Sequence, residues 1–276
     1  MKLFKTSTGI ILQNNSENFL LEEDWDELIN HENLFQFLST QTKNKIDVDW
    51  TNIKILAPIH KQEVWAAGVT YLRSRDARME ESKDAGGADF YSKVYNAERP
   101  ELFFKALPQR VAAHNEAVFI RKDSKWNVPE PELTLFINSK GNISAYTIGN
   151  DMSSRDIEGE NPLYLPQAKV YERSAALGPC LYISENEITL DTTISINIKR
   201  ENTIAFEGSI QLNRMKRKLK ELAEYLFREM QFEHGCFLMT GTGVVPPNDF
   251  TLNEDDEVEI SITEIGTLKN IVAYKK

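Results

Sequence analysis

Two glutamates and an aspartate have a spacing that suits a metal site. Glu130 and Glu132 are two residues apart in VPEPEL, so on a strand both carboxylates point to the same face. Like charges this close repel each other unless a proton or a cation lies between them. Asp151 follows at the end of AYTIGND. Three carboxylates without a nearby His or Cys favour a hard cation (Mg²⁺, with Mn²⁺ or Ca²⁺ as alternatives) over zinc. The same spacing is also compatible with a solvated acidic rim of a strand.

We expect two strands to bring these carboxylates together. ELTLFIN and ISAYTIG have the β-branched, alternating pattern of half-buried strands. A turn over SKGN, residues 139–142, would join them as an antiparallel hairpin and return Asp151 to the glutamate pair. Pro129 and Pro131 flank Glu130, which confines that point to an edge strand or to a bulged strand start.

The remaining segments indicate a β-rich α+β protein. Further strands are predicted in AVFIR, CLYIS, TISINIK, TIAFEG, EVEISITEIG and IVAYK. Charged helical segments around residues 72–96 are separated by a Gly-Gly break at 86–87. A long helix is predicted over residues 214–235, RMKRKLKELAEYLFREMQFEHG, with a solvated basic start and Gly235 as its C-terminal cap.

Two domains are expected, with a boundary near residue 60. Residues 1–60 predict a small, charged α+β domain with a hairpin around Gly9 and a helix in WDELINHENLFQFLST. Residues 61–276 would form the larger domain, in which the texture changes to short apolar runs separated by Gly, Pro and Asn.

Charge and composition exclude several classes of partner. The 276 residues carry a net charge of −10, so non-specific attraction to nucleic acid or to an anionic membrane is not expected. No run approaches the about 18 apolar residues of a membrane span, and no signal peptide is apparent, so we expect a cytoplasmic protein. Cys180 and Cys236 are expected to be reduced packing residues. An anionic substrate would need a metal or local positive charge.

Four motifs, PEPEL, GNDMSSRD, LPQAK and LMTGTG, resemble the fumarylacetoacetate hydrolase family. That family has an E-x-E pair, a D-M-x-x-R-D segment, a later lysine and a late Gly-Thr turn in this order. The likeness extends from about residue 63 to the C-terminus. It implies a mixed β-sandwich or roll, a Mg²⁺-dependent enzyme that binds a small 2-oxo acid, and a homo-oligomer, a dimer or tetramer. It also implies that Glu130, Glu132 and Asp151 are the metal ligands.

The resemblance implies further site residues. Lys169 matches the active-site lysine, and Glu101, in a string typical of one subgroup, is assigned to proton transfer. The residues assigned to substrate binding are Arg155, Lys105, Thr242, Tyr71 and Glu158.

Two departures from the hydrolases of the family favour an elimination reaction. Ser74 stands where those hydrolases often have the histidine that activates water, and Glu158 stands where a glutamine often follows the R-D pair. Long strings such as EVWAAGVTYLRSRDARMEES and DIEGENPLYLPQAKVY resemble the family's dehydratases of 2-dehydro-3-deoxy sugar acids such as 2-dehydro-3-deoxy-D-arabinonate. The expected products are 2,5-dioxopentanoate and water. The alternatives are an acylpyruvate hydrolase or an oxaloacetate decarboxylase on the same metal site, and a non-catalytic binding protein of the same fold.

Overall fold

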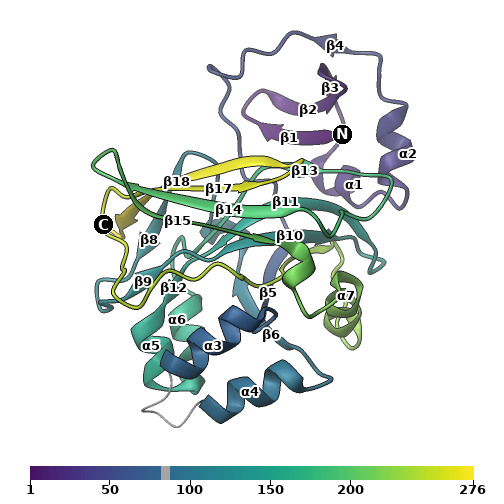
Figure 1. Cartoon of the computed structure of the whole chain (residues 1–276). Helices are drawn as coiled ribbons and strands as arrows, with labels where there is room; N and C mark the ends of the chain where they lie inside the picture. Colours follow the sequence, from purple (N-terminus) through teal and green to yellow (C-terminus); the bar gives the residue numbers. More distant parts are fainter. Residues whose placement is uncertain (82–87) are drawn as a thin grey trace.

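A large and a smaller β-sheet pack against each other in the body of the protein (Figure 1). The computed structural model describes residues 1–81 and 88–276, so the predicted break at 86–87 lies outside the described residues. The large sheet has the order β4-β3-β2-β1-β13-β11-β10-β16-β5-β6, with β7 beside β13. Its strands are β1 Lys2–Thr6, β2 Gly9–Asn14, β3 Glu17–Leu21, β4 Lys45–Ile46, β5 Glu63–Gly68, β6 Glu101–Ala106, β7 Val111–Ala112, β10 Pro131–Ile137, β11 Ile143–Asp151, β13 Ala175–Tyr182 and β16 Cys236–Met239.

The smaller sheet has the order β15-β14-β17-β18-β8, and a short pair joins β9 to β12. These strands are β8 Glu116–Ile120, β9 Asn127–Val128, β12 Ser153–Ser154, β14 Thr193–Arg200, β15 Thr203–Gln211, β17 Glu257–Ile262 and β18 Gly266–Tyr274. Both sheets are mixed. In the large sheet, β7 runs parallel to β13 and β5 runs parallel to β16, whereas β1 is antiparallel to β13. In the smaller sheet, β8 runs parallel to β18, whereas β17 is antiparallel to β18. The predicted β-rich α+β fold is confirmed.

Strand β10 lies between β11 and β16 and is buried along its whole length. Leu133 belongs to the core that the large sheet shares with Ile196 of the smaller sheet, whereas Phe136 belongs to the opposite core with Leu28 of a helix near the N-terminus. Pro131 is the first residue of β10. The two prolines around Glu130 were compatible with an edge strand or with a strand start. Because β10 is a central strand that begins at Pro131, the strand start is the correct alternative.

Four helices, α3 to α6, gather at the end of the molecule that is remote from β2, β3 and β4 (Figure 1). The helices are α1 Trp25–Ile29, α2 Leu34–Ser39, α3 Leu72–Glu81, α4 Ala88–Asn96, α5 Arg155–Glu160, α6 Leu165–Lys169 and α7 Leu219–Phe227, with 3₁₀ turns η1 Pro108–Arg110, η2 Pro162–Tyr164 and η3 Leu212–Arg214. Within the described part of the chain, no helix is long and apolar enough to cross a membrane.

The N-terminal segment extends the large sheet, because β1 pairs with β13. The hairpin around Gly9 is confirmed. The helix expected over WDELINHENLFQFLST is instead two helices, α1 and α2, because Asn30 ends the first one. Its side-chain amide donates to the carbonyl of Asp26 at 3.1 Å, and its Oδ1 accepts from the backbone N–H of Ser139 at 2.9 Å. The domain boundary near residue 60 stays a prediction.

The long helix expected over residues 214–235 is wrong at both ends, since α7 covers only Leu219–Phe227. Arg217 is 7% exposed and donates to the carbonyls of Val94, Ala97 and Glu98 at the end of α4. The basic segment is therefore anchored in the protein and is not a solvated helix face. Gly235 has a φ of +72° but lies in a turn well beyond the helix, so it is not the cap.

Both cysteines are free and buried, as expected for packing residues. Burial raises the pKa of the Cys180 thiol to about 12, so this thiol stays protonated and unreactive.

Candidate active site

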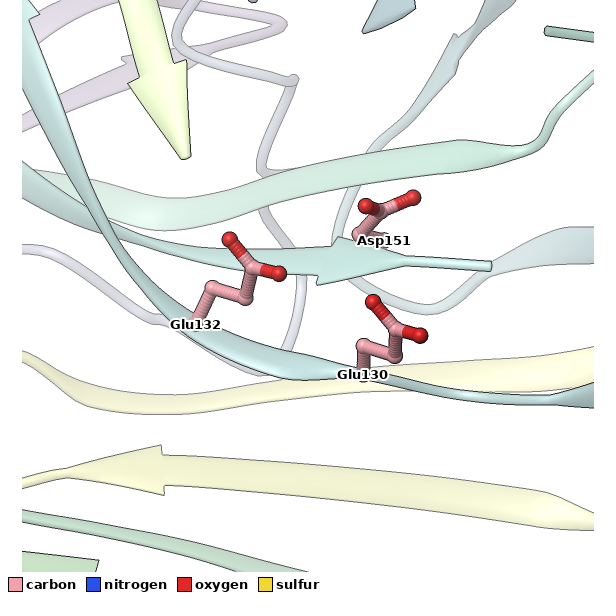
Figure 2. Close-up of side chains that lie close together, drawn as sticks. All are labelled: Glu130, Glu132 and Asp151. Atoms are coloured by element: carbon pink, nitrogen blue, oxygen red, sulfur yellow. The ribbon is translucent and has the colours of Figure 1, made fainter. Parts of the chain in front are cut away.

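The hairpin of β10 and β11 places the three predicted carboxylates together (Figure 2). Glu132 pairs with Gly149, and the backbone N–H of Asp151 donates to the carbonyl of Glu130 at 3.0 Å. One carboxylate oxygen from each of the three residues lies within 4.8 Å of the others, and all three side chains are buried. The predicted hairpin and the predicted proximity are confirmed, and the alternative of a solvated rim is excluded.

This donor set fits a hard divalent cation. Three buried carboxylates offer only oxygen ligands, which Mg²⁺ prefers. Burial, together with the charges of Asp151 and Glu130, raises the pKa of Glu132 well above its usual value. A cation between the carboxylates would relieve that repulsion. The backbone N–H of Gly241 donates to Oε2 of Glu132 at 2.6 Å and orients this carboxylate.

Basic side chains surround Glu130. Nζ of Lys169 lies 2.6 Å from Oε2 of Glu130 and 3.0 Å from Oδ2 of Asp151. Nη2 of Arg155 lies 2.8 Å from Oε1 of Glu130. Burial alone would raise the pKa of Glu130, but Lys169 and Arg155 lower it to about 2. The predicted lysine and arginine therefore both lie beside the carboxylate cluster.

Lys105 lies behind the cluster with each of its three N–H groups opposite an acceptor. Its Nζ is 3.0 Å from the carbonyl of Met152, 2.5 Å from the carbonyl of Lys169 and 2.5 Å from Oδ1 of Asp151. The side chain is fully buried, and this burial lowers its pKa. In this arrangement Lys105 fixes Asp151 and the backbone of Lys169. The family resemblance implies that Lys105 contacts substrate. For such a contact, Lys105 would have to exchange one of these partners.

Glu101 lies on β6 directly opposite Gly68 of β5. Its Oε2 is buried and, within the described residues, has no hydrogen-bond partner. Burial raises the pKa of Glu101, although the nearby charges of Arg78 and Lys169 oppose the shift. A Cβ at position 68 would come within 2.0 Å of Oε2, so the glycine makes room for this carboxyl group. A buried carboxyl with a raised pKa beside the cluster is suited to proton donation.

The other predicted residues lie nearby but are engaged in different ways. A small cavity lies between helix α3 and the carboxylate cluster, and Thr242 lines it. The hydroxyl of Thr242 donates to the carbonyl of Val244 at 3.1 Å. Tyr71 is buried, and this burial and the charge of Glu132 raise the pKa of its hydroxyl. Glu158 forms a buried ion pair with Arg78 and accepts a hydrogen bond from Oγ of Ser153 at 3.0 Å.

Ser74, which stands where the hydrolases of the family often have a histidine, is used by its own helix. Its Oγ donates to the carbonyl of Tyr71 at 2.8 Å and accepts from the N–H of Tyr71 at 3.3 Å. These bonds close the first turn of α3, so this position supplies no base that could activate water.

Sequence reasoning missed Arg78, Gly68 and Gly241. Arg78 lies one helical turn after Ser74, and this spacing could have placed it on the same face of α3. Gly241 has a φ of +92°, which favours glycine and brings its N–H to Glu132. The cavity beside the carboxylate cluster has a volume of about 10 Å³, room for about one water molecule.

Comparison with known proteins decides the family. The family described as "Fumarylacetoacetate (FAA) hydrolase C-terminal" matches residues 64–273. The chain belongs to the fumarylacetoacetate hydrolase family. This confirms the resemblance that the motifs carry.

Two curated members of the family are dehydratases by name. The chain is 46% identical over 221 residues to the 2-dehydro-3-deoxy-D-arabinonate dehydratase of Saccharolobus solfataricus. The aligned region covers 79% of this chain and 74% of that protein. It is 43% identical over 234 residues to a probable 2-keto-3-deoxyxylonate dehydratase of Haloferax volcanii, covering 84% and 80% respectively.

One similar solved structure contains both a metal ion and an organic ligand. The chain is similar to 2-keto-3-deoxy-D-arabinonate dehydratase complexed with magnesium and 2,5-dioxopentanoate, with a TM-score of 0.86, 37% identity and full coverage of both chains. That structure supports the predicted fold and holds the cation that the carboxylate cluster of this chain fits.

Proposed function

We propose that this chain is a Mg²⁺-dependent dehydratase of a 2-dehydro-3-deoxy sugar acid, 2-dehydro-3-deoxy-D-arabinonate or a close relative, with 2,5-dioxopentanoate and water as products. The observation that carries the proposal is the placement of Lys169 and Glu101 beside three buried carboxylates, with Ser74 bound to its own helix. A site with an acid and a basic group, in which a serine bound to its own helix stands where the hydrolases often have the water-activating histidine, is suited to elimination. The identities to the dehydratases support the same reaction.

The reaction removes one molecule of water and then rearranges the product. A proton leaves C3, and the hydroxyl group leaves C4 with a second proton, so that a C3–C4 double bond and water form. Movement of a proton from C5 to C3 gives a C4–C5 enol, and ketonisation of this enol gives the aldehyde of 2,5-dioxopentanoate.

Glu130, Glu132 and Asp151 would hold the cation. When bound, a divalent cation would polarise the 2-oxo group and acidify the C3–H bond. We assign Lys169 to accepting the C3 proton or stabilising the negative charge that develops as it leaves. Glu101 would donate a proton to the departing hydroxyl, because its raised pKa keeps it protonated at higher pH than an ordinary glutamate.

The remaining assignments concern binding and assembly. Arg155 would attract the anionic substrate into an acidic protein. The further residues predicted to bind substrate are Lys105, Thr242, Tyr71 and Glu158. We also propose a division into residues 1–60 and 61–276, which the family match from residue 64 supports. A homo-oligomer and a cytoplasmic location stay predictions.

A panel of 2-oxo acids tests the proposal. Purified protein with Mg²⁺ is incubated with 2-dehydro-3-deoxy-D-arabinonate, an acylpyruvate or oxaloacetate, and the products are identified by mass. We expect the product of the sugar acid to be lighter than the substrate by the mass of one water molecule. Release of a carboxylic acid from the acylpyruvate alone would indicate a hydrolase, and CO₂ from oxaloacetate alone would indicate a decarboxylase. Binding without turnover of any compound would indicate a non-catalytic protein.

Removal of the metal is the second test. Exhaustive chelation should abolish turnover, and added Mg²⁺ should restore it. Full activity after chelation would contradict the proposal.

A further inference from the structure

A surface cavity of about 550 Å³ lies where strands β8 and β18 end. These strands run parallel, and Ile120 pairs with Tyr274, so the segments that follow them leave the smaller sheet at the same edge. Arg110 of η1 and the segment after α6 complete the wall. Among the described residues, none lines both this cavity and the small cavity beside the carboxylate cluster. A volume of this size is typical of a small-molecule site.

The wall of this cavity is basic, although the protein has a net charge of −10. Its basic residues are Arg110, Arg121, Lys122, Lys275 and Lys276. The guanidinium of Arg121 donates to both carboxylate oxygens of Asp123, at 2.8 and 2.6 Å, and to the carbonyl of Gln167 at 3.1 Å. The side chains of the other four basic residues have no hydrogen-bond or ion-pair partner in the described part of the chain. Positive charges that share a cavity repel one another unless an anion lies among them.

Acidic side chains do not neutralise these four charges. Two acidic residues are found among the described residues of the wall, Asp123 and Glu172. Asp123 is bound to Arg121, and Glu172 has no basic partner among the residues that the structure describes. One free carboxylate and four free basic groups leave the cavity positively charged, so it attracts an anion.

Apolar and aromatic side chains form the rest of the wall, among them Phe119, Val170 and Tyr171. The ring of Tyr171 lies 5.6 Å from the guanidinium carbon of Arg121 and 5.9 Å from Nζ of Lys105, the lysine that fixes Asp151. The cavity is therefore a neighbour of the carboxylate cluster with residues of its own. Apolar surface beside the basic groups suits the carbon skeleton of an organic anion better than it suits a bare inorganic ion.

We propose that this cavity binds a small organic polyanion, a molecule with at least two phosphate or carboxylate groups, at a site separate from the metal site. Guanidinium and ammonium groups donate strong hydrogen bonds to both kinds of oxygen. The free basic side chains come from three segments: η1, the turn after β8 and the segment after β18. A ligand with several anionic groups can engage more than one of these segments at once. The proposal concerns a second site and does not rest on the dehydratase reaction.

Calorimetry on the full chain tests the proposal with two probes, in excess Mg²⁺ so that the metal site is loaded. Tricarballylate carries three carboxylates, and propane-1,3-diyl bisphosphate carries two phosphates. We expect saturable binding of one molecule per chain, with a Kd below about 1 mM for at least one probe. The probe that binds more tightly identifies the anionic group that the cavity prefers. Binding should weaken as the salt concentration rises.

Three substitutions in the wall should change this Kd in opposite directions. Arg110→Gln and Lys275→Gln each remove one free positive charge and should raise the Kd about 3- to 10-fold, the effect of one hydrogen bond. Glu172→Gln removes the free negative charge and should lower the Kd by about twofold or more. Lys43→Gln is the matched control, because Lys43 is exposed in the N-terminal segment and its substitution changes the net charge equally. The Kd should not change in this variant.

The same variants show whether the cavity is separate from the metal site. Arg110→Gln and Lys275→Gln should keep the kcat/KM of the unmodified protein for the substrate of the metal site. A loss of kcat/KM in proportion to the rise in Kd would make the cavity part of the path to the metal and would overturn the proposal of a second site. The thermal midpoint of each variant verifies that it is folded.

Two further results would overturn the proposal. One is the absence of saturable binding of either probe to the unmodified protein. The other is a rise in Kd for Lys43→Gln equal to that for Arg110→Gln, which would show a general effect of charge and not a site. If the unmodified protein dehydrates no sugar acid, the proposed function fails, and the calorimetry still decides whether the cavity binds a polyanion.

Discussion

Each carboxylate of the cluster has a different set of partners. Glu130 is held by Lys169 and Arg155, Asp151 by Lys105 and Lys169, and Glu132 by the backbone N–H of Gly241. In a buried site these differences matter, because a charge without a partner is far more costly there than in water. Lys169 is the residue shared by two of the carboxylates, so it is the most informative residue to remove.

Lys169→Ala should retain Mg²⁺ binding and lose turnover. The three ligands remain, and the loss of a positive charge beside them does not weaken their attraction for a cation. Turnover should fall by about 10²–10⁴-fold, the usual effect of one general acid–base group. Calorimetry with Mg²⁺ and steady-state kinetics measure the two effects. Lys140→Ala, in the exposed turn between β10 and β11, serves as the control. Turnover like that of the unmodified protein would remove Lys169 from the mechanism.

At the scale of elements, the register of β5 and β6 determines where the proton donor lies. Glu101 faces Gly68 across the pair, and the absence of a side chain at position 68 leaves space for its carboxyl group. The register that the turn imposes on β10 and β11 brings Asp151 to Glu130 in a similar way. Strand pairing is thus the means by which residues far apart in sequence become neighbours in the site.

Gly68→Ala should reduce activity without removing any polar group. The new methyl group would lie 2.0 Å from Oε2 of Glu101, and the flexible carboxyl end must move away. We expect kcat to fall toward the value of Glu101→Gln, about 10²-fold. In the Glu101→Gln background the same substitution should have little further effect. A large loss in both backgrounds would instead indicate damage to the strand pair, which a lower thermal midpoint would also show.

At the scale of the whole molecule, Asp26 links the N-terminal segment to the body of the protein. It lies on α1, is 3% exposed, accepts from Nε2 of Gln62 at 2.7 Å and has Nδ1 of His60 at 2.7 Å. Gln62 also donates to the carbonyl of His234, near the start of β16. Burial alone would raise the pKa of Asp26, but the hydrogen bonds from Gln62 and His60 lower it.

Asp26→Asn should lower the free energy of unfolding by about 1–3 kcal/mol at pH 7, since it removes the charge that accepts these hydrogen bonds. A carboxyl whose pKa is lower in the folded state contributes its full stability above its unfolded pKa, and this contribution is lost as the pH falls through the folded pKa. The difference between the two proteins should therefore shrink on acidification. Urea unfolding at pH 7 and pH 3 measures it, with Glu32→Gln at an exposed position as control. A difference that does not depend on pH would contradict this explanation.

The sequence by itself determined those features that depend on local spacing. The two-residue period of a strand and a turn over residues 139–142 were sufficient to predict that Glu130, Glu132 and Asp151 meet, and the motif order indicated the family. The β-rich fold was equally predictable, because alternating β-branched runs occur along most of the chain.

Only the tertiary structure decided which partner each charged group has. Arg78 and Glu158 come from different helices, and nothing in their local sequence indicates that they pair. Lys105 carries the features of a site lysine, yet the packing around it offers two carbonyls and a carboxylate. Helix α7 begins late because the buried Arg217 is bound to carbonyls of another segment. The partners of these charged side chains depend on contacts between residues that are distant in the sequence. The packing of the sheets and helices creates these contacts, and local periodicity does not encode them.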